Sequence, residues 1–201
     1  MGRKERVVCA TVEWTMETHH RRETLGFTPL TGISRVFSDW FGTANAKILY
    51  DSDVDEFCSA TFARHILSRD NVAVVATTDD GDVFGGFCAA AVTSLFTQHV
   101  DPSICLFSFE SHGRCPTPAR FPQARPEDNP AFVEVWKNDQ RGFLAFGGVS
   151  GGFVCVGDER LYSCADSLAD AFEGLDNTTL TGATGFGVYV HFRRLLVIQL
   201  C

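Results

Sequence analysis

Ser150 is the residue whose surroundings look most like a catalytic centre. It occupies the middle of residues 148–152 (GVSGG), which match the G-x-S-x-G pattern that exposes a nucleophilic serine on a strained strand-to-helix turn in α/β-hydrolases. His191 follows downstream, as a hydrolase triad requires. However, the next residues, 153–156 (FVCV), are β-rich and do not begin a helix. The pattern favours a glycine-rich turn between two strands, and serine hydrolysis by Ser150 is the less favoured hypothesis.

Cys58 is the second candidate nucleophile, because it lies near the predicted start of a helix. The positive end of a helix lowers the pKa of a thiol and can make it reactive toward peroxide. His65 lies seven residues further along, about 10 Å by helical rise, so the two side chains cannot form a Cys–His pair. The sequence favours Cys58 as a small core residue, with a thiol-dependent, peroxide-handling enzyme as the alternative.

Metal-binding patterns are incomplete in this chain. Residues 51–55 (DSDVD) resemble the start of an EF-hand calcium loop, but Glu56 and Phe62 stand where that loop needs glycine and glutamate. His112 and Cys115 have metal-like spacing without any paired C-x-x-C motif. We therefore expect no metal and no cofactor.

Three further acidic residues, Asp79, Asp80 and Asp82, fall at a predicted hairpin tip. A tip is exposed, so we expect ordinary pKa values there and a turn rather than an acid–base pair.

Composition restricts the class of protein. The chain has 201 residues, is 45% hydrophobic and contains 18 phenylalanines, which favours one domain with an aromatic core. Its net charge of −8 disfavours binding to nucleic acid. There is no signal-peptide pattern and no apolar run of membrane-spanning length. We therefore expect a cytoplasmic protein that does not insert into a membrane, with its eight cysteines mostly free and buried.

The first half of the chain predicts two helices and a hairpin. Residues 33–41 have helical periodicity. Asp53 or Asp55 is expected to cap a second helix, whose inner face carries Phe57, Phe62 and Ile66. Two β-rich runs, 72–76 and 83–87, flank an Asp-Gly turn. Gly85-Gly86 inside the second run indicates a bulge or the close approach of another backbone.

The second half predicts short strands. A strand at 104–109 precedes a proline-rich surface excursion at 111–130, and further β-runs follow at 132–136, 143–146, 153–156, 186–191 and 195–200. Arg193-Arg194 is expected at the hairpin tip between the last two runs. The fold class is therefore α+β, mainly β: an antiparallel β-sandwich flanked by a few helices. Residues 1–31 form an N-terminal leader whose order the sequence leaves open, and residues 32–201 form the domain.

Several segments resemble, in order, the TLDc family of oxidation-resistance proteins. They are the run 48–50 (ILY), the acidic turn 51–55, residues 84–87 (FGGF), the strand 104–109 (ICLFSF) and the closing strand 195–200 (LLVIQL). The resemblance covers roughly residues 33–201, and residues 146–176 depart from the family pattern. It implies the same β-sandwich with a few helices packed around it.

The resemblance also implies a function. TLDc proteins protect cells against oxidative stress, and several bind and regulate the vacuolar proton-pumping ATPase. We therefore expect a non-catalytic interaction module with a protein partner. It would be cytoplasmic and would reach endosomal or vacuolar membranes through that partner. The sequence leaves open the contacting residues and the oligomeric state.

Overall fold

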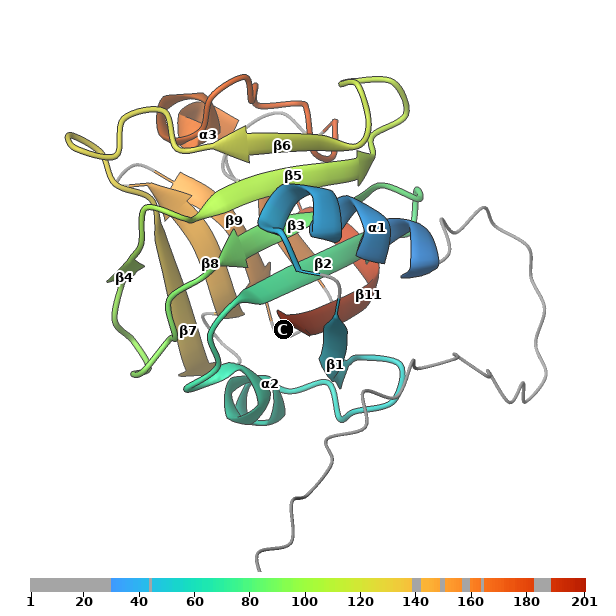
Figure 1. Cartoon of the computed structure of the whole chain (residues 1–201), viewed down its shortest axis with the longest axis vertical. Coiled ribbons are helices and arrows are strands. Elements are labelled where there is room, and N and C mark those ends of the chain that lie inside the picture. Colours follow the sequence, from blue (N-terminus) through green and yellow to red (C-terminus); the bar gives the residue numbers. More distant parts are fainter. Residues whose placement is uncertain are drawn as a thin grey trace, which may run out of the picture.

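The computed structural model describes residues 30–43, 45–138, 142–148, 151–156, 160–163, 165–182 and 189–201. Figure 1 shows antiparallel sheets with helices packed around them, which confirms the predicted α+β, mainly β sandwich. In chain order the elements are α1 (Leu30–Phe41), β1 (Ala46–Asp51), α2 (Ser59–Ile66), β2 (Val72–Thr78), β3 (Val83–Cys88), β4 (His99–Val100), β5 (Cys105–Glu110), β6 (Ala119–Pro122), β7 (Phe132–Asn138), β8 (Gly142–Gly148), β9 (Gly151–Val156), β10 (Arg160–Ser163), α3 (Ala165–Ala171) and β11 (Tyr189–Leu200).

The long strand β11 joins the two sheets. The strand order is β4-β7-β8-β9-β10-β11-β2-β3-β5-β6, and β1 also pairs with β11. Residues 189–191 of β11 pair with β10, whereas residues 192–199 pair with β2. The prediction of two strands with Arg193-Arg194 at a hairpin tip is therefore wrong. A register shift between Phe192 and Arg194 bends one continuous strand, because an extra residue in a strand changes its direction without ending it.

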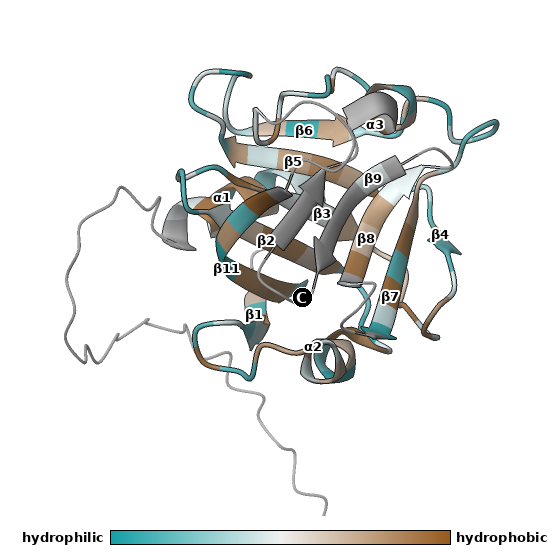
Figure 2. Ribbon diagram, turned by 180° about the vertical axis from the view of Figure 1, so that it is seen from behind, coloured by the Kyte–Doolittle hydropathy of each residue, from teal (hydrophilic) through white to brown (hydrophobic). Residues whose placement is uncertain are grey.

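The main core lies between the two sheets. Alternate residues of β2, β3 and β5 face those of β7 and β8, so apolar side chains from both sheets meet in one layer. Figure 2 shows the hydrophobic residues along these strands. Helices α2 and α3 contribute Phe62, Ile66 and Leu168, which are all at least 98% buried.

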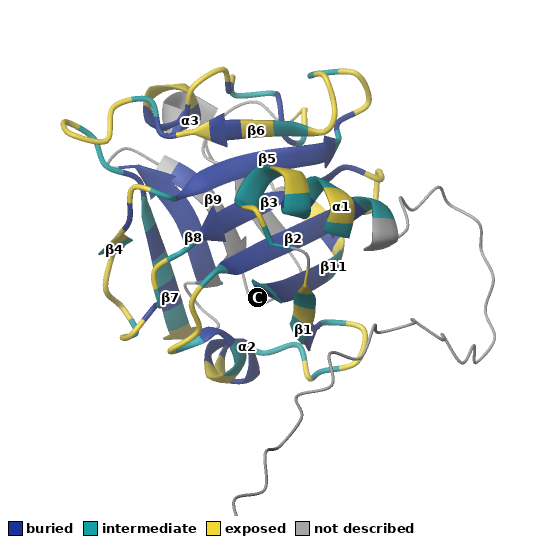
Figure 3. Cartoon of the chain, viewed as in Figure 1, coloured by how far each residue is buried: buried dark blue, intermediate teal, exposed yellow. Residues whose placement is uncertain are grey.

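A second apolar layer lies under α1, on the other face of the sheet that contains β2 (Figure 3). The Phe37 ring meets that of Phe107 at 5.3 Å, and the Phe41 ring stacks on that of Phe87 at 3.9 Å. All seven residues of β2 are consequently buried, because both faces of this strand are covered. The predicted helix at 33–41 is confirmed and begins at Leu30.

Gly85 and Gly86 make the close approach that the sequence predicted. A Cβ atom on Gly85 would lie 1.8 Å from the carbonyl oxygen of Val74 on the neighbouring strand. A Cβ atom on Gly86 would lie 2.7 Å from Cγ of Phe146, which reaches across from the opposite sheet. Gly85 thus leaves room for the backbone of the neighbouring strand β2, and Gly86 leaves room for an aromatic ring from the opposite sheet.

The predicted strands at 72–76, 83–87, 104–109, 132–136, 143–146, 153–156 and 195–200 coincide with β2, β3, β5, β7, β8, β9 and the second half of β11. The strands β1, β4, β6 and β10 and the helix α3 were not predicted. Strand β6 lies within the proline-rich excursion and pairs with β5 at the end of the strand order. An edge position tolerates Pro122, since proline lacks the N–H that a central strand needs.

Candidate functional site: two ion pairs that hold the loops

Asp82 is buried, although the sequence predicted an exposed residue at a hairpin tip. It follows the Asp80-Gly81 turn and leads into β3, and only 1% of its surface is exposed. Its backbone N–H donates to Oγ1 of Thr78 at 3.0 Å, within the same turn. Asp79 and Asp80 are exposed, as expected. The prediction fails for Asp82 because a loop distant in sequence covers it.

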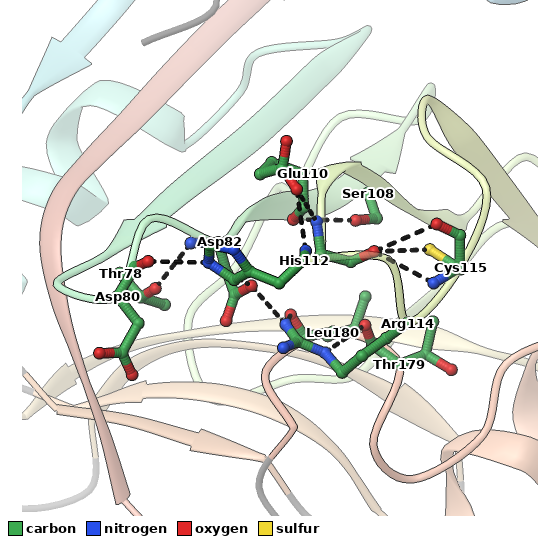
Figure 4. Close-up of polar contacts among 11 residues, drawn as sticks. Thr78, Asp80, Asp82, Ser108, Glu110, His112, Arg114, Cys115, Thr179 and Leu180 are labelled. Atoms are coloured by element: carbon green, nitrogen blue, oxygen red, sulfur yellow. Dashed lines mark hydrogen bonds and ion pairs between the residues drawn. The ribbon is translucent and has the colours of Figure 1, made fainter. Parts of the chain in front are cut away.

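Arg114 supplies that cover and forms an ion pair with the Asp82 carboxylate. It belongs to the loop between β5 and β6. Its Nη2 also donates to the carbonyl oxygen of Leu180 at 3.1 Å, and its Nε donates to that of Thr179 at 3.4 Å. One guanidinium therefore ties together the β2–β3 hairpin, the β5–β6 loop and the loop after α3 (Figure 4).

His112 packs against the same carboxylate from the exposed side. Its Nε2 donates to the carbonyl oxygen of Asp80 at 2.8 Å and lies 3.6 Å from Oδ1 of Asp82. The Glu110 carboxylate fixes this part of the loop, since Oε1 accepts the N–H groups of Ser111 and His112. Figure 4 shows these contacts converging on one short stretch of loop.

Burial raises the pKa of Asp82, and the neighbouring Arg114 and His112 offset only part of that effect. A carboxyl with a raised pKa is often a functional group. Here the carboxylate is almost fully covered and its strong partner is a fixed guanidinium. A reacting molecule would have to displace Arg114 to reach it. The arrangement is therefore suited to holding three loops in place.

A second ion pair fixes the acidic turn that follows β1. Arg194 of β11 donates from Nε to Oδ1 of Asp51 at 2.9 Å and from Nη2 to Oδ2 at 2.5 Å, and its Nε lies 3.2 Å from Oδ2 of Asp53. Burial alone would raise the pKa of Asp51, but the Arg194 guanidinium and the N–H of Asp53 outweigh it and lower that pKa. The bidentate geometry fixes the turn against the strand that carries the bulge.

The prediction that Asp53 or Asp55 caps α2 is wrong. Asp55 instead accepts the N–H of Asp51 at 2.9 Å and so closes the turn on itself. Cys58 is the N-cap residue, with extended backbone angles and with Sγ accepting the N–H of Thr61 at 3.5 Å. The Asp55 side chain is engaged within its own turn and that of Asp53 contacts Arg194, so a thiol takes the capping position.

The thiols differ sharply in their surroundings. Cys58 is partly exposed, and Sγ also donates to Oγ1 of Thr61 at 3.4 Å. Cys88 and Cys105 are buried; burial raises the pKa of Cys88 to about 12 and also raises that of Cys105. Such thiols are unreactive at neutral pH. The five cysteines whose side chains are described are free, and Cys201 is exposed.

Ser150 lies outside the described residues, but the elements on both sides of it are described. Strand β8 ends at Gly148, β9 begins at Gly151, and these two residues pair in an antiparallel register. The element after Ser150 is therefore a strand, whereas a nucleophile elbow leads into a helix.

His112 and Cys115 do not converge on a common point. His112 contacts the hairpin, while Cys115 Sγ lies 3.3 Å from Oγ of Ser111. Within the described part of the chain, no three His, Cys, Asp or Glu side chains are placed to hold a metal ion. No described helix is long and apolar enough to cross a membrane.

Sequence reasoning missed the partners of both buried carboxylates. Arg114 is 32 positions from Asp82, and Arg194 is 143 positions from Asp51. No local spacing signals a pair at such separations. The one local feature that bears on either pair is the Arg193-Arg194 doublet, which the sequence predicts at a hairpin tip.

Comparison with known families gives a match to the model of the TLDc domain over residues 28–190. This confirms the resemblance drawn from the sequence motifs. The match spans most of the chain and includes the Asp82–Arg114 pair. No curated protein matches the chain.

Proposed function

Because the chain belongs to the TLDc domain family, we propose that it is a non-catalytic interaction module that supports resistance to oxidative stress by binding and regulating the vacuolar proton-pumping ATPase. The observation that carries this proposal is the family match over residues 28–190. The ATPase is proposed as the partner because the chain resembles TLDc proteins, several of which bind it. On this proposal the protein is cytoplasmic and reaches endosomal or vacuolar membranes through the ATPase.

The two ion pairs support an interaction role physically. Arg114 and Arg194 each hold a connecting segment in one conformation against the sandwich. Binding by loops that are already ordered loses less conformational entropy than binding by mobile ones. A rigid scaffold that presents fixed loops is a common basis for recognition.

The test adds purified protein to isolated vacuolar ATPase and measures co-sedimentation together with bafilomycin-sensitive ATP hydrolysis. We expect the protein to sediment with the ATPase and to change its rate of hydrolysis. Absence of binding by a chain that circular dichroism shows to be folded would refute the ATPase part of the proposal. Survival of peroxide-treated cells, with and without the protein, tests the stress-resistance part separately.

Two charge reversals indicate which loops make the contact. Glu56 lies in the turn before α2, and Glu127 lies in the loop between β6 and β7; both are exposed. Glu56→Lys and Glu127→Lys change the net charge equally, so a general electrostatic effect would alter the binding of both variants to the same extent. Loss of binding in only one variant assigns the contact to that loop.

A thiol-dependent peroxide-handling enzyme is the second candidate, favoured by the position of Cys58. Its Sγ accepts an N–H at the helix N-terminus and is partly exposed. Both features assist a thiolate nucleophile. Peroxide consumption that disappears in Cys58→Ser and persists in Cys201→Ser would support this activity. Labelling by a fluorophosphonate that disappears in Ser150→Ala would support the hydrolase hypothesis instead.

A further inference from the structure

Two large hydrophobic side chains that lie four positions apart in the sequence are exposed in and just before β4. Phe96 is 52% exposed and Val100 is 57% exposed, and Val54 at 82% is the third such residue in the described ranges. Leu95 points the other way and packs against the main core. The segment from Ser94 to Val100 therefore anchors itself with one apolar residue and presents two others to solvent.

The backbone holds the Phe96 ring in this outward position. Phe96 has φ of +56°, a conformation that is unusual for a bulky side chain and that Gly or Asn would adopt more readily. Its N–H donates to the carbonyl oxygen of Val135 at 2.9 Å, and Nε2 of His99 contacts the carbonyl oxygen of Ser94 at 2.9 Å. An ordered loop that displays phenylalanine in a strained conformation indicates a use for the ring.

The same segment borders an open sheet edge whose strand contains no Asp, Glu, Lys or Arg. Strand β4 pairs with β7 and stands at the end of the strand order, on the outer side of the sheet in Figure 1. Proteins usually protect such edges with charged residues, lysine above all. Residues 83–100 contain no Asp, Glu, Lys or Arg.

We propose that the β4 face, defined by Phe96, Val100 and the open edge of β4, is a self-association surface whose occupant is a second copy of this chain. Each copy carries a net charge of −8, so two copies repel one another over most of their surfaces. The β4 face is a stretch where they can approach without bringing like charges together. A basic partner would find no charge to pair with there, which favours a second copy as the occupant.

A two-fold axis beside β4 brings identical edges together. Such a contact is self-complementary: the Phe96 and Val100 side chains of both copies are removed from water, and the two β4 edges face one another. The area that a two-residue strand and two exposed side chains can bury is small compared with the roughly 1,600 Å² that a standard interface buries. The dimer is therefore weak and reversible, and it does not depend on the proposed ATPase contact.

Sedimentation equilibrium of the full chain over a concentration series, at low and high salt, tests the proposal. We expect the average mass to rise toward that of a dimer, and to rise further at high salt, because screening weakens the repulsion between acidic copies. A wild-type chain that stays monomeric throughout would overturn the proposal and leave the β4 face to a different protein.

Two matched variants separate this surface from a general charge effect. Val100→Lys and Val54→Lys both replace an exposed valine and both change the net charge by one unit. We expect Val100→Lys to weaken association at least about tenfold, because a lysine blocks edge pairing and interrupts the apolar contact. Val54→Lys should leave association unchanged or slightly stronger, because it lowers the repulsion. Equal effects of the two variants would contradict the proposal.

Phe96→Asn tests the ring without endangering the fold, since asparagine adopts a positive φ more readily than phenylalanine. We expect this variant to unfold at the wild-type temperature or above it and to lose association. Retained association would show that the ring is not part of the surface.

Discussion

Replacing Gly86 by alanine tests why the FGGF motif contains two glycines. The new Cβ would lie 2.7 to 2.9 Å from three ring atoms of Phe146, where ordinary carbon contacts need about 3.5–4.0 Å. The ring must therefore retreat by about 1 Å within a core where Phe146 is only 1% exposed. Overpacking of this kind costs about 1–3 kcal/mol, or roughly 2–4 °C of melting temperature for each kcal/mol in a chain of this size.

A double-mutant cycle identifies the Phe146 ring as the cause of that cost. Gly86→Ala, Phe146→Ala and the double variant are compared by urea unfolding at constant m-value. Alanine lacks Cγ, Cδ1 and Cδ2, the three Phe146 atoms that the new Cβ would meet. The double variant should therefore be more stable than the sum of the single effects predicts, by about 1 kcal/mol or more. A neutral Gly86→Ala, or additivity within about 0.5 kcal/mol, would refute this reasoning.

Gly85→Ala provides the matched comparison. Its Cβ would lie 1.8 Å from the carbonyl oxygen of Val74 and 2.8 Å from Cζ of Phe107. Strand β2 is paired on both sides, with β11 and β3, so its backbone cannot move aside. We expect a loss of more than about 4 kcal/mol that Phe107→Leu does not repair. Rescue by Phe107→Leu would show that the side chain, and not the backbone, is the limiting contact.

Three further predictions concern the ion pairs and the thiols. Arg194→Met should lower the free energy of unfolding by about 2–4 kcal/mol at neutral pH, because it leaves the Asp51 carboxylate buried without its partner. The pKa of Asp51 is lowered in the folded state, so its contribution to stability is present above its unfolded pKa and is lost as the pH falls through its folded pKa. Unfolding measured at a series of acidic pH values should show this loss of stability in the wild type and a smaller loss in Arg194→Met. The pKa of Asp82 is raised in the folded state, so its ionisation should cost stability as the pH rises from its unfolded to its folded pKa. Over that interval the wild type should lose stability relative to Asp82→Asn. A difference in stability between the two proteins that does not change with pH would contradict the raised pKa. Maleimide labelling of the native protein near pH 8, mapped by mass spectrometry, should modify the exposed Cys201 and spare Cys88, whose pKa is about 12; rapid labelling of Cys88 before unfolding would contradict its burial.

Local patterns were enough to predict the hairpin, the helix over the sheet and the glycine contacts. The Asp80-Gly81 turn needs a positive φ, and Gly81 adopts one of +92°. The apolar spacing at 33–41 predicted a helix, and Phe37 within that helix is 1% exposed. The hairpin and the helix depend on residues within a few positions of one another, so propensity and periodicity were sufficient. The Gly85-Gly86 pair indicated a close approach, but the ring that approaches Gly86 belongs to Phe146 on a distant strand.

The same reasoning failed wherever two distant segments decide the outcome. Asp82 was assigned to solvent because its own turn is polar, yet Arg114 buries it from another loop. The sequence predicts Arg193-Arg194 at a hairpin tip because the doublet lies between two β-rich runs. In the structure Arg194 lies inside the continuous strand β11 and pairs with Asp51.

The sequence by itself determined the family, the fold class and the candidate nucleophiles. Only the tertiary structure decided which charged groups are buried and paired, where β11 bends, and that a thiol caps α2. The physical reason is that burial and ion pairing belong to surfaces brought together by folding. The residues next to a charged group in the sequence therefore do not predict whether that group is buried or paired.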